Sequence, residues 1–126
     1  MKYLFLLFHE EGPEDIAWKQ EEHSWSDGSM AEWIKFSEDA ARVATQLGGE
    51  ALQPSTTATV VSMRGGRLVV TDGPFIETKE QLAGFYVFDC PSREVALDIA
   101  ARIPWAAPDG FVEVRPIVDF DGVAEG

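Results

Sequence analysis

The hydrophobic positions of this chain alternate between patterns typical of strands and patterns typical of helices. Residues 3–8 form a continuous apolar run, which is typical of a central strand buried on both faces of a sheet. Gly65-Gly66 separates two β-rich runs and predicts a two-residue hairpin turn between them. The further strands that the pattern predicts lie at residues 50–53, 57–63, 67–71, 85–88 and 111–117.

A helical repeat of apolar residues begins at Ser29. Ser29 and Glu32 have the spacing of a capping box, in which each side chain satisfies a free backbone donor of the other residue. Apolar side chains then recur at helical spacing, with Trp33 among them. Gly48-Gly49 offers the left-handed geometry that ends many helices. We therefore expect a first long helix over residues 29–47.

A second helix is predicted between Ser92, a favourable cap, and Pro104, which stops it. The resulting order is strand, helix, hairpin, connector, strand, helix, strand. This order predicts an α+β, ferredoxin-like fold, in which two helices cover one face of an antiparallel sheet. We expect one domain over residues 1–120, followed by a C-terminal tail at residues 121–126.

The predicted fold leaves the second face of its sheet without cover. Several strands with an exposed apolar face would form an unusually large patch for a soluble monomer. Two copies that meet face to face would bury this patch, so the fold favours a homodimer.

The chain is strongly acidic, with 22 acidic against 10 basic residues and a formal net charge of −12. This charge repels phosphate backbones and anionic lipids, so we expect neither nucleic-acid nor membrane binding. Its simplest role is solubility. Cys90 is the single cysteine, so no disulfide can form within the chain. No apolar run approaches the roughly 20 residues that span a bilayer, and we expect a cytoplasmic protein.

A dense acidic segment follows the first strand. Residues 10–22 contain six acidic side chains and one lysine, and we interpret them as a solvated loop with a helical turn near residues 16–19. His9 directly precedes this segment, and His23 directly follows it. They lack recognisable metal-ligand spacing, so no metal site is predicted, and polar surface is the simpler interpretation of both.

The connector at residues 72–82 concentrates the polar chemistry of the chain. Asp72 precedes a Gly-Pro turn, where an aspartate usually accepts hydrogen bonds from its own turn, although contact with a ligand is the alternative. Glu77, Lys79 and Glu80 lie within four residues. In a cleft, a lysine and a carboxylate shift each other's ionisation and can transfer protons. On an open surface, the same charges form weak ion pairs.

Arg115 and Trp33 also each have two interpretations, one as a ligand-binding residue and one without contact to a ligand. Arg115 shares a strand face with Glu113, two residues away. If that face lines a cavity, its guanidinium can clamp a carboxylate; if it faces water, the pair is a solvated edge. Trp33 belongs either to the helix core or to an aromatic cage for a ligand, and core is the more common role.

The run Asp72-Gly73-Pro74-Phe75, followed by Glu77, Lys79-Glu80 and Gly84-Phe85, resembles the DGPF group of the YCII-related family. The likeness extends to Met1–Leu4 and Val112–Pro116, and so covers nearly the whole chain. It implies a dimeric α+β barrel. Better-studied relatives are associated with a His–Asp pair for acid–base work, onto which neither His9 nor His23 aligns, and this departure weakens a histidine-based mechanism.

We therefore expect a small homodimer that binds an organic molecule in a pocket between the sheet and the first helix. If the protein is an enzyme, cofactor-free proton transfer of isomerase or lyase type is the expected chemistry. The alternative is a regulatory module that works with an extracytoplasmic-function sigma factor, as the resemblance implies, with the acidic segment as its docking surface. Candidate catalytic residues are Asp72, Glu77 and Glu80, and candidate ligand-binding residues are Lys79, Arg115, His9 and Trp33.

Overall fold

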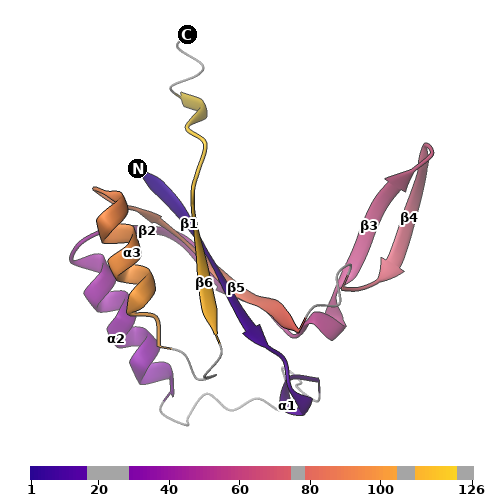
Figure 1. Ribbon diagram of the computed structural model, residues 1–126, viewed down its shortest axis with the longest axis horizontal. Coiled ribbons are helices and arrows are strands. Elements are labelled where there is room, and N and C mark those ends of the chain that lie inside the picture. The colour runs from indigo at the N-terminus through magenta and orange to yellow at the C-terminus, as the bar shows by residue number, and fades with distance from the viewer. Residues whose placement is uncertain (17–28, 75–78, 105–109, 122–126) are drawn as a thin grey trace.

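The computed structural model describes residues 1–16, 29–74, 79–104 and 110–121 of the chain (Figure 1). Its strands are β1 (Lys2–Glu10), β2 (Thr45–Ala51), β3 (Thr59–Arg64), β4 (Arg67–Asp72), β5 (Glu80–Asp89) and β6 (Phe111–Pro116). Its helices are α1 (Pro13–Ile16), α2 (Ser29–Ala41) and α3 (Arg93–Ala101), with a short 3-10 helix at Ser55–Thr57.

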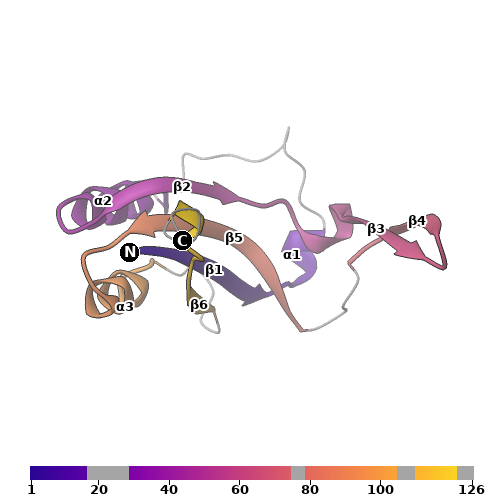
Figure 2. The same ribbon diagram turned by 90° about the horizontal axis from the view of Figure 1, so that it is seen from above.

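Four strands form one antiparallel sheet in the order β2-β5-β1-β6. Both long helices, α2 and α3, lie on the same side of this sheet (Figure 1, Figure 2). The predicted α+β, ferredoxin-like class is confirmed, with the β3–β4 hairpin inserted between β2 and β5. None of the helices in the described ranges is long and apolar enough to cross a membrane.

The core lies between the sheet and the two helices. Tyr3, Phe5 and Leu7 alternate along β1 and are buried on the helix side. Phe5 meets Phe88 of β5 edge to face, with ring centroids 5.3 Å apart. The intervening side chains of β1, from Leu4 to Phe8, are only partly buried. One face of β1 is thus fully covered in the single chain, whereas the sequence predicted burial on both.

The first long helix is shorter than predicted, because it ends at Ala41 and not at residue 47. Its last turn tightens where the Val43 amide donates to the Ala40 carbonyl at 3.1 Å. From Thr45 the chain pairs with β5 instead. Gly49 serves that pairing and does not cap a helix: a methyl group there would lie 2.7 Å from Cδ1 of Tyr86. Cross-strand packing therefore overrides the local helical pattern.

Two local predictions are confirmed. Gly65 and Gly66 have φ values of 58° and 79° and form the two-residue turn of the β3–β4 hairpin. The Ser92 hydroxyl accepts a hydrogen bond from the Val95 amide at 3.2 Å and caps α3. A short helix, α1, lies at Pro13–Ile16, and most of the helical turn predicted near residues 16–19 lies outside the described residues.

The β3–β4 hairpin forms a separate two-stranded sheet that projects away from the body of the molecule (Figure 1). Two contacts hold its base. The Gly73 amide donates to the Ala58 carbonyl at 2.8 Å. The Glu11 carboxylate accepts from the Ser55 amide at 2.7 Å, and also from the Ser55 hydroxyl. The direction of the hairpin is thus set by hydrogen bonds at its root.

Candidate functional site

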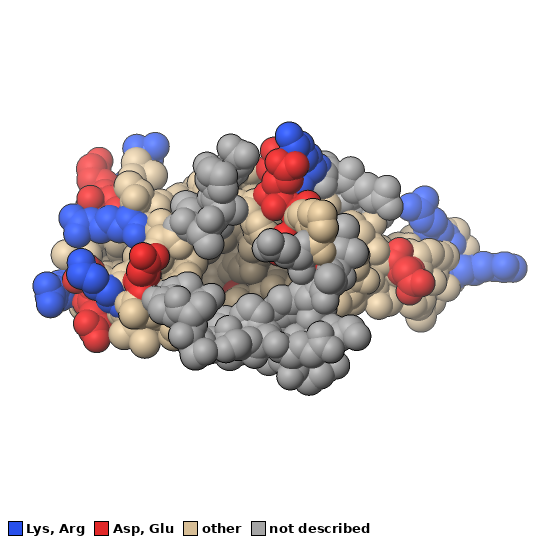
Figure 3. Space-filling view, turned by 90° about the horizontal axis from the view of Figure 1, so that it is seen from below, with Lys and Arg blue, Asp and Glu red and all other residues tan. Residues whose placement is uncertain are grey.

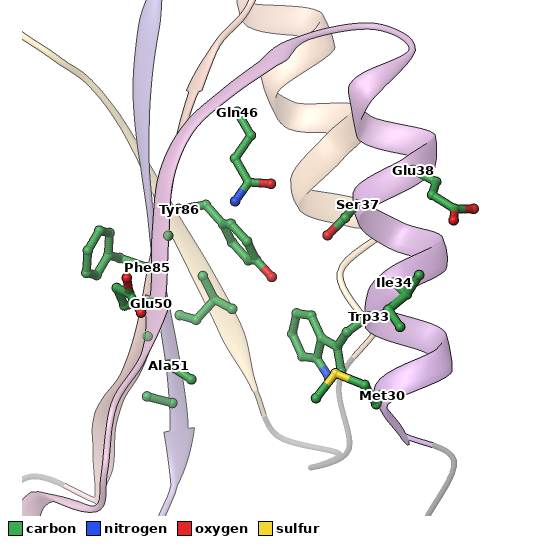
Figure 4. Close-up of a pocket in the computed structure, with 14 residues that line it drawn as sticks. Met30, Trp33, Ile34, Ser37, Glu38, Gln46, Glu50, Ala51, Phe85 and Tyr86 are labelled. Atoms are coloured by element: carbon green, nitrogen blue, oxygen red, sulfur yellow. The ribbon is translucent and has the colours of Figure 1, made fainter. Parts of the chain in front are cut away.

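A cavity of about 590 Å³ lies between α2 and the β2–β5 edge of the sheet (Figure 4). This position agrees with the pocket predicted between the sheet and the first helix. The face formed by α2 contributes Met30, Trp33, Ile34, Ser37 and Glu38, and β1 contributes Leu7. The strands β2 and β5 contribute Gln46, Gly49, Glu50, Ala51, Ala83, Gly84, Phe85 and Tyr86.

The cavity has an aromatic wall made by Trp33 and Tyr86. Their rings are nearly parallel, at 27°, with centroids 6.4 Å apart. Phe36, which is buried, supports both rings from behind, at centroid distances of 6.1 Å and 5.6 Å. At the mouth, Met30 and Ile34 remain 39% and 52% exposed. An apolar ligand would find a flat, pre-formed surface here, bordered by side chains that are still open to solvent.

Two glycines make room for this wall on the sheet side. A Cβ atom at Gly84 would lie 2.8 Å from the Glu50 carbonyl oxygen. One at Gly49 would lie 2.7 Å from the Tyr86 ring. Any larger residue at either position would push against β2 or the aromatic wall, so the shape of the cavity depends on both positions being glycine.

The polar groups aimed into the cavity are uncharged. The hydroxyls of Tyr86 and Ser37 and the amide of Gln46 point into the space between strand and helix (Figure 4). Burial raises the pKa of Tyr86 above its ordinary value of 10.0, and its phenol hydroxyl can donate a hydrogen bond. Glu38 and Glu50 direct their carboxylates away from the cavity in the same view.

The structure does not bring the predicted acid–base residues together at this cavity. Asp72 is exposed at the end of β4 in the projecting hairpin. Glu80 begins β5, opposite Glu10 of β1. Lys79 is exposed, and its Nζ lies 3.4 Å from the Glu10 carboxylate. Glu77 lies outside the described residues. A catalytic role for this group stays a prediction, and the described members sit beyond the cavity lining.

Of the predicted ligand-binding residues, Trp33 lines the cavity. Arg115 is exposed on the sheet face away from the helices, opposite Leu4 of β1. Glu80 lies opposite Glu10, near the other end of β1. Arg115 and Glu80 are therefore separated by roughly 20 Å along β1. His9 is half-buried opposite Gln81 and lies outside the lining. Arg115 and Glu80 therefore do not share a pocket.

Sequence reasoning missed Tyr86, Ser37 and Gln46. Strand alternation places Tyr86 on the same face as Gly84 and Phe88, so a signal for its direction was present. No such signal existed for Gln46, because the sequence predicted that the helix continued through this position. Tyr86 and Gln46 reach the cavity only through the pairing of β2 with β5.

The described residues include no group of three or more His, Cys, Asp or Glu side chains that could hold a metal ion. Cys90 is buried, and burial raises the pKa of its thiol, which lowers the fraction of reactive thiolate.

The chain thus has a ferredoxin-like α+β fold with a ligand-sized cavity at the helix–sheet junction. The model of the YCII-related domain matches residues 1–121, so this chain belongs to the YCII-related family. It is similar to an uncharacterised protein from Rhizobium meliloti (strain 1021), with 39% identity over 119 residues, covering 93% of this chain and 92% of that protein.

Proposed function

We propose that this protein binds a small, flat and largely apolar organic molecule in the cavity between α2 and the sheet. The observation that carries this proposal is the Trp33–Tyr86 wall facing a space of about 590 Å³. That volume lies within the range of typical small-molecule sites, and a few polar groups in an apolar lining are their usual composition.

The polar groups also select among ligands. Neutral donors and acceptors from Tyr86, Ser37 and Gln46 suit a carbonyl, hydroxyl or amide on the ligand. The net charge of −12 disfavours an anionic ligand at long range. A neutral ring compound with one or two polar substituents is the class that best combines these properties.

Binding is the function that this geometry supports best, and acid–base catalysis is a finer proposal. Proton transfer in the cavity would use Tyr86 or Ser37 as the proton carrier, because their hydroxyls point into it, whereas Asp72 and Glu80 lie outside its lining. A phenol is a competent general acid when it is held within hydrogen-bond reach of the reacting atom. Chemical conversion of the ligand during incubation with the protein is the measurement that tests for proton-transfer catalysis.

The test is calorimetry with a panel of neutral bicyclic aromatic compounds. For each compound that binds the wild-type protein, Trp33→Leu should raise the dissociation constant by about tenfold or more, because the aromatic wall is lost. Lys35→Gln is the matched control on the same helix, because Lys35 is exposed and lies outside the cavity lining, and it should retain the wild-type affinity. Equal affinity of wild type and Trp33→Leu for every binder would overturn the proposal.

The charged connector offers a separate comparison. Lys79→Ala and Glu80→Ala should leave the ligand-induced thermal shift unchanged if the ligand lies in the cavity. A shift that disappears in these variants but persists in Trp33→Leu would move the site to the connector and away from the aromatic wall.

A further inference from the structure

One face of the β3–β4 hairpin is apolar and is not covered by any other element among the described residues. Val61 lies opposite Val70, and Met63 lies opposite Leu68, so the four side chains share a face. Each is between 57% and 66% exposed. We call this set the hairpin face. Four large apolar side chains in one continuous exposed patch mark an interaction surface more often than a solvated one.

The hairpin also lacks the support that small sheets require. Its two strands pair with each other and, within the described chain, with no third strand. An isolated two-stranded hairpin is marginally stable in water, and its unpaired edges invite further contacts. Because the Glu11–Ser55 and Gly73–Ala58 contacts fix its base, the hairpin is held away from its own body. Among the described residues no element covers the hairpin face, and a second molecule can supply that cover.

The second surface that the described helices leave uncovered is the opposite face of the four-stranded sheet, here called the open sheet face. Strand register places Leu4, Leu6, Phe8, Phe85, Val87 and Phe111 on it. Most are half-buried in the single subunit, and Phe111 is 47% exposed. Acidic side chains at Glu10, Glu50 and Glu113 are exposed on the same side, together with the cation Arg115.

Charge identifies a partner for the hairpin. Arg64 and Arg67 flank its turn, and basic side chains gather at its far end (Figure 3). The whole chain carries a net charge of −12, so a basic tip on an acidic molecule is complementary to a second copy of the same chain. The hairpin leaves the sheet after β2 and returns at β5, so its base is joined to two neighbouring strands of that sheet.

We propose that the β3–β4 hairpin is an intersubunit arm that docks its hairpin face on a second copy of this chain. The arm is about 20 Å long, enough to reach past its own sheet onto a neighbour. A two-fold arrangement lets both copies exchange arms, so that each arm extends the contact between two open sheet faces. Arg64 and Arg67 then meet the acidic side chains of the partner.

Sedimentation equilibrium tests the contribution of the arm. The double variant Met63→Ser/Leu68→Ser should raise the dimer dissociation constant by about tenfold or more, because apolar contact is lost at the interface. Val69→Ser is the matched control, since Val69 lies on the opposite face of the same strand, and it should change the constant by less than about twofold. Equal effects of both variants, or a wild-type chain that stays monomeric, would overturn the proposal.

Photo-crosslinking identifies what the arm touches and keeps the proposal testable if the double variant does not fold. A photoreactive benzoylphenylalanine at position 68 would be placed in chains of natural and of ¹⁵N-labelled composition, which are then mixed. Crosslinked peptides with one label from each chain would support the arm. Crosslinks only within one chain, or only to other proteins when the reaction is run in the expressing cells, would overturn it. This experiment does not depend on any ligand in the cavity.

Discussion

A missing side chain at Gly84 keeps β2 and β5 close enough to form the cavity wall. We expect Gly84→Ala to lower the free energy of unfolding by about 1–3 kcal/mol, because its methyl group would lie 2.8 Å from a backbone oxygen that cannot move cheaply. Gly48→Ala is the matched control, since nothing lies within 4 Å of its Cβ position. Urea unfolding of both variants measures the difference. A Gly84→Ala protein as stable as Gly48→Ala would show that the strands can separate freely.

We expect the free energy of unfolding to fall at alkaline pH, because Tyr86 is partly buried in the folded protein. Burial raises its pKa above the ordinary value of 10.0, so the folded protein holds this proton more tightly than the unfolded chain does. The stabilisation is complete below pH 10 and is lost as the pH rises through the folded-state pKa, because the unfolded chain releases the proton first. Tyr86→Phe should remove this part of the slope. Urea unfolding from pH 8 to 10.5 measures both proteins, and identical slopes would contradict the assignment.

At the scale of elements, α3 depends on its cap. Ser92→Ala should lower the free energy of unfolding by about 1 kcal/mol, because the Val95 amide loses its hydrogen-bond partner. Ser92→Asp should keep most of the stability, since a carboxylate can accept the same bond and favours a helix N-terminus. Thermal unfolding followed by circular dichroism compares the two. Equal losses in both variants would mean that the hydroxyl does more than cap the helix.

The elements also show which parts of the fold are encoded locally. The Gly65-Gly66 turn and the Ser92 cap were predictable because each depends on a few adjacent residues. The end of α2 was not, because pairing with β5 converts residues 45–47 from a plausible helix into strand. The same pairing builds the cavity. The sequence therefore indicated Trp33 as a candidate ligand-binding residue, but it did not indicate that Gln46 lies at the cavity.

For the whole molecule, the chemistry of the connector was easier to see in the sequence than the chemistry of the cavity. Charged residues such as Lys79 and Glu80 draw attention because they are clustered in sequence. The cavity combines residues from α2, β1, β2 and β5, and the polar side chains that point into it are neutral. A site assembled in this way leaves no continuous motif, so the tertiary structure was needed to find it.

We propose that the open sheet face makes the main contact between two copies of this chain and that the arm strengthens this contact. Leu6 lies at the centre of this face, between Phe85 and Glu113 in the strand register. We expect Leu6→Asp to abolish dimerisation, because it would bury an unpaired charge among apolar side chains and beside an existing carboxylate. Leu97→Asp, on the exposed side of α3, is the control and should remain dimeric. Analytical ultracentrifugation at micromolar concentration separates the outcomes. A Leu6→Asp dimer with wild-type affinity would place the interface elsewhere and leave this face open to a different partner.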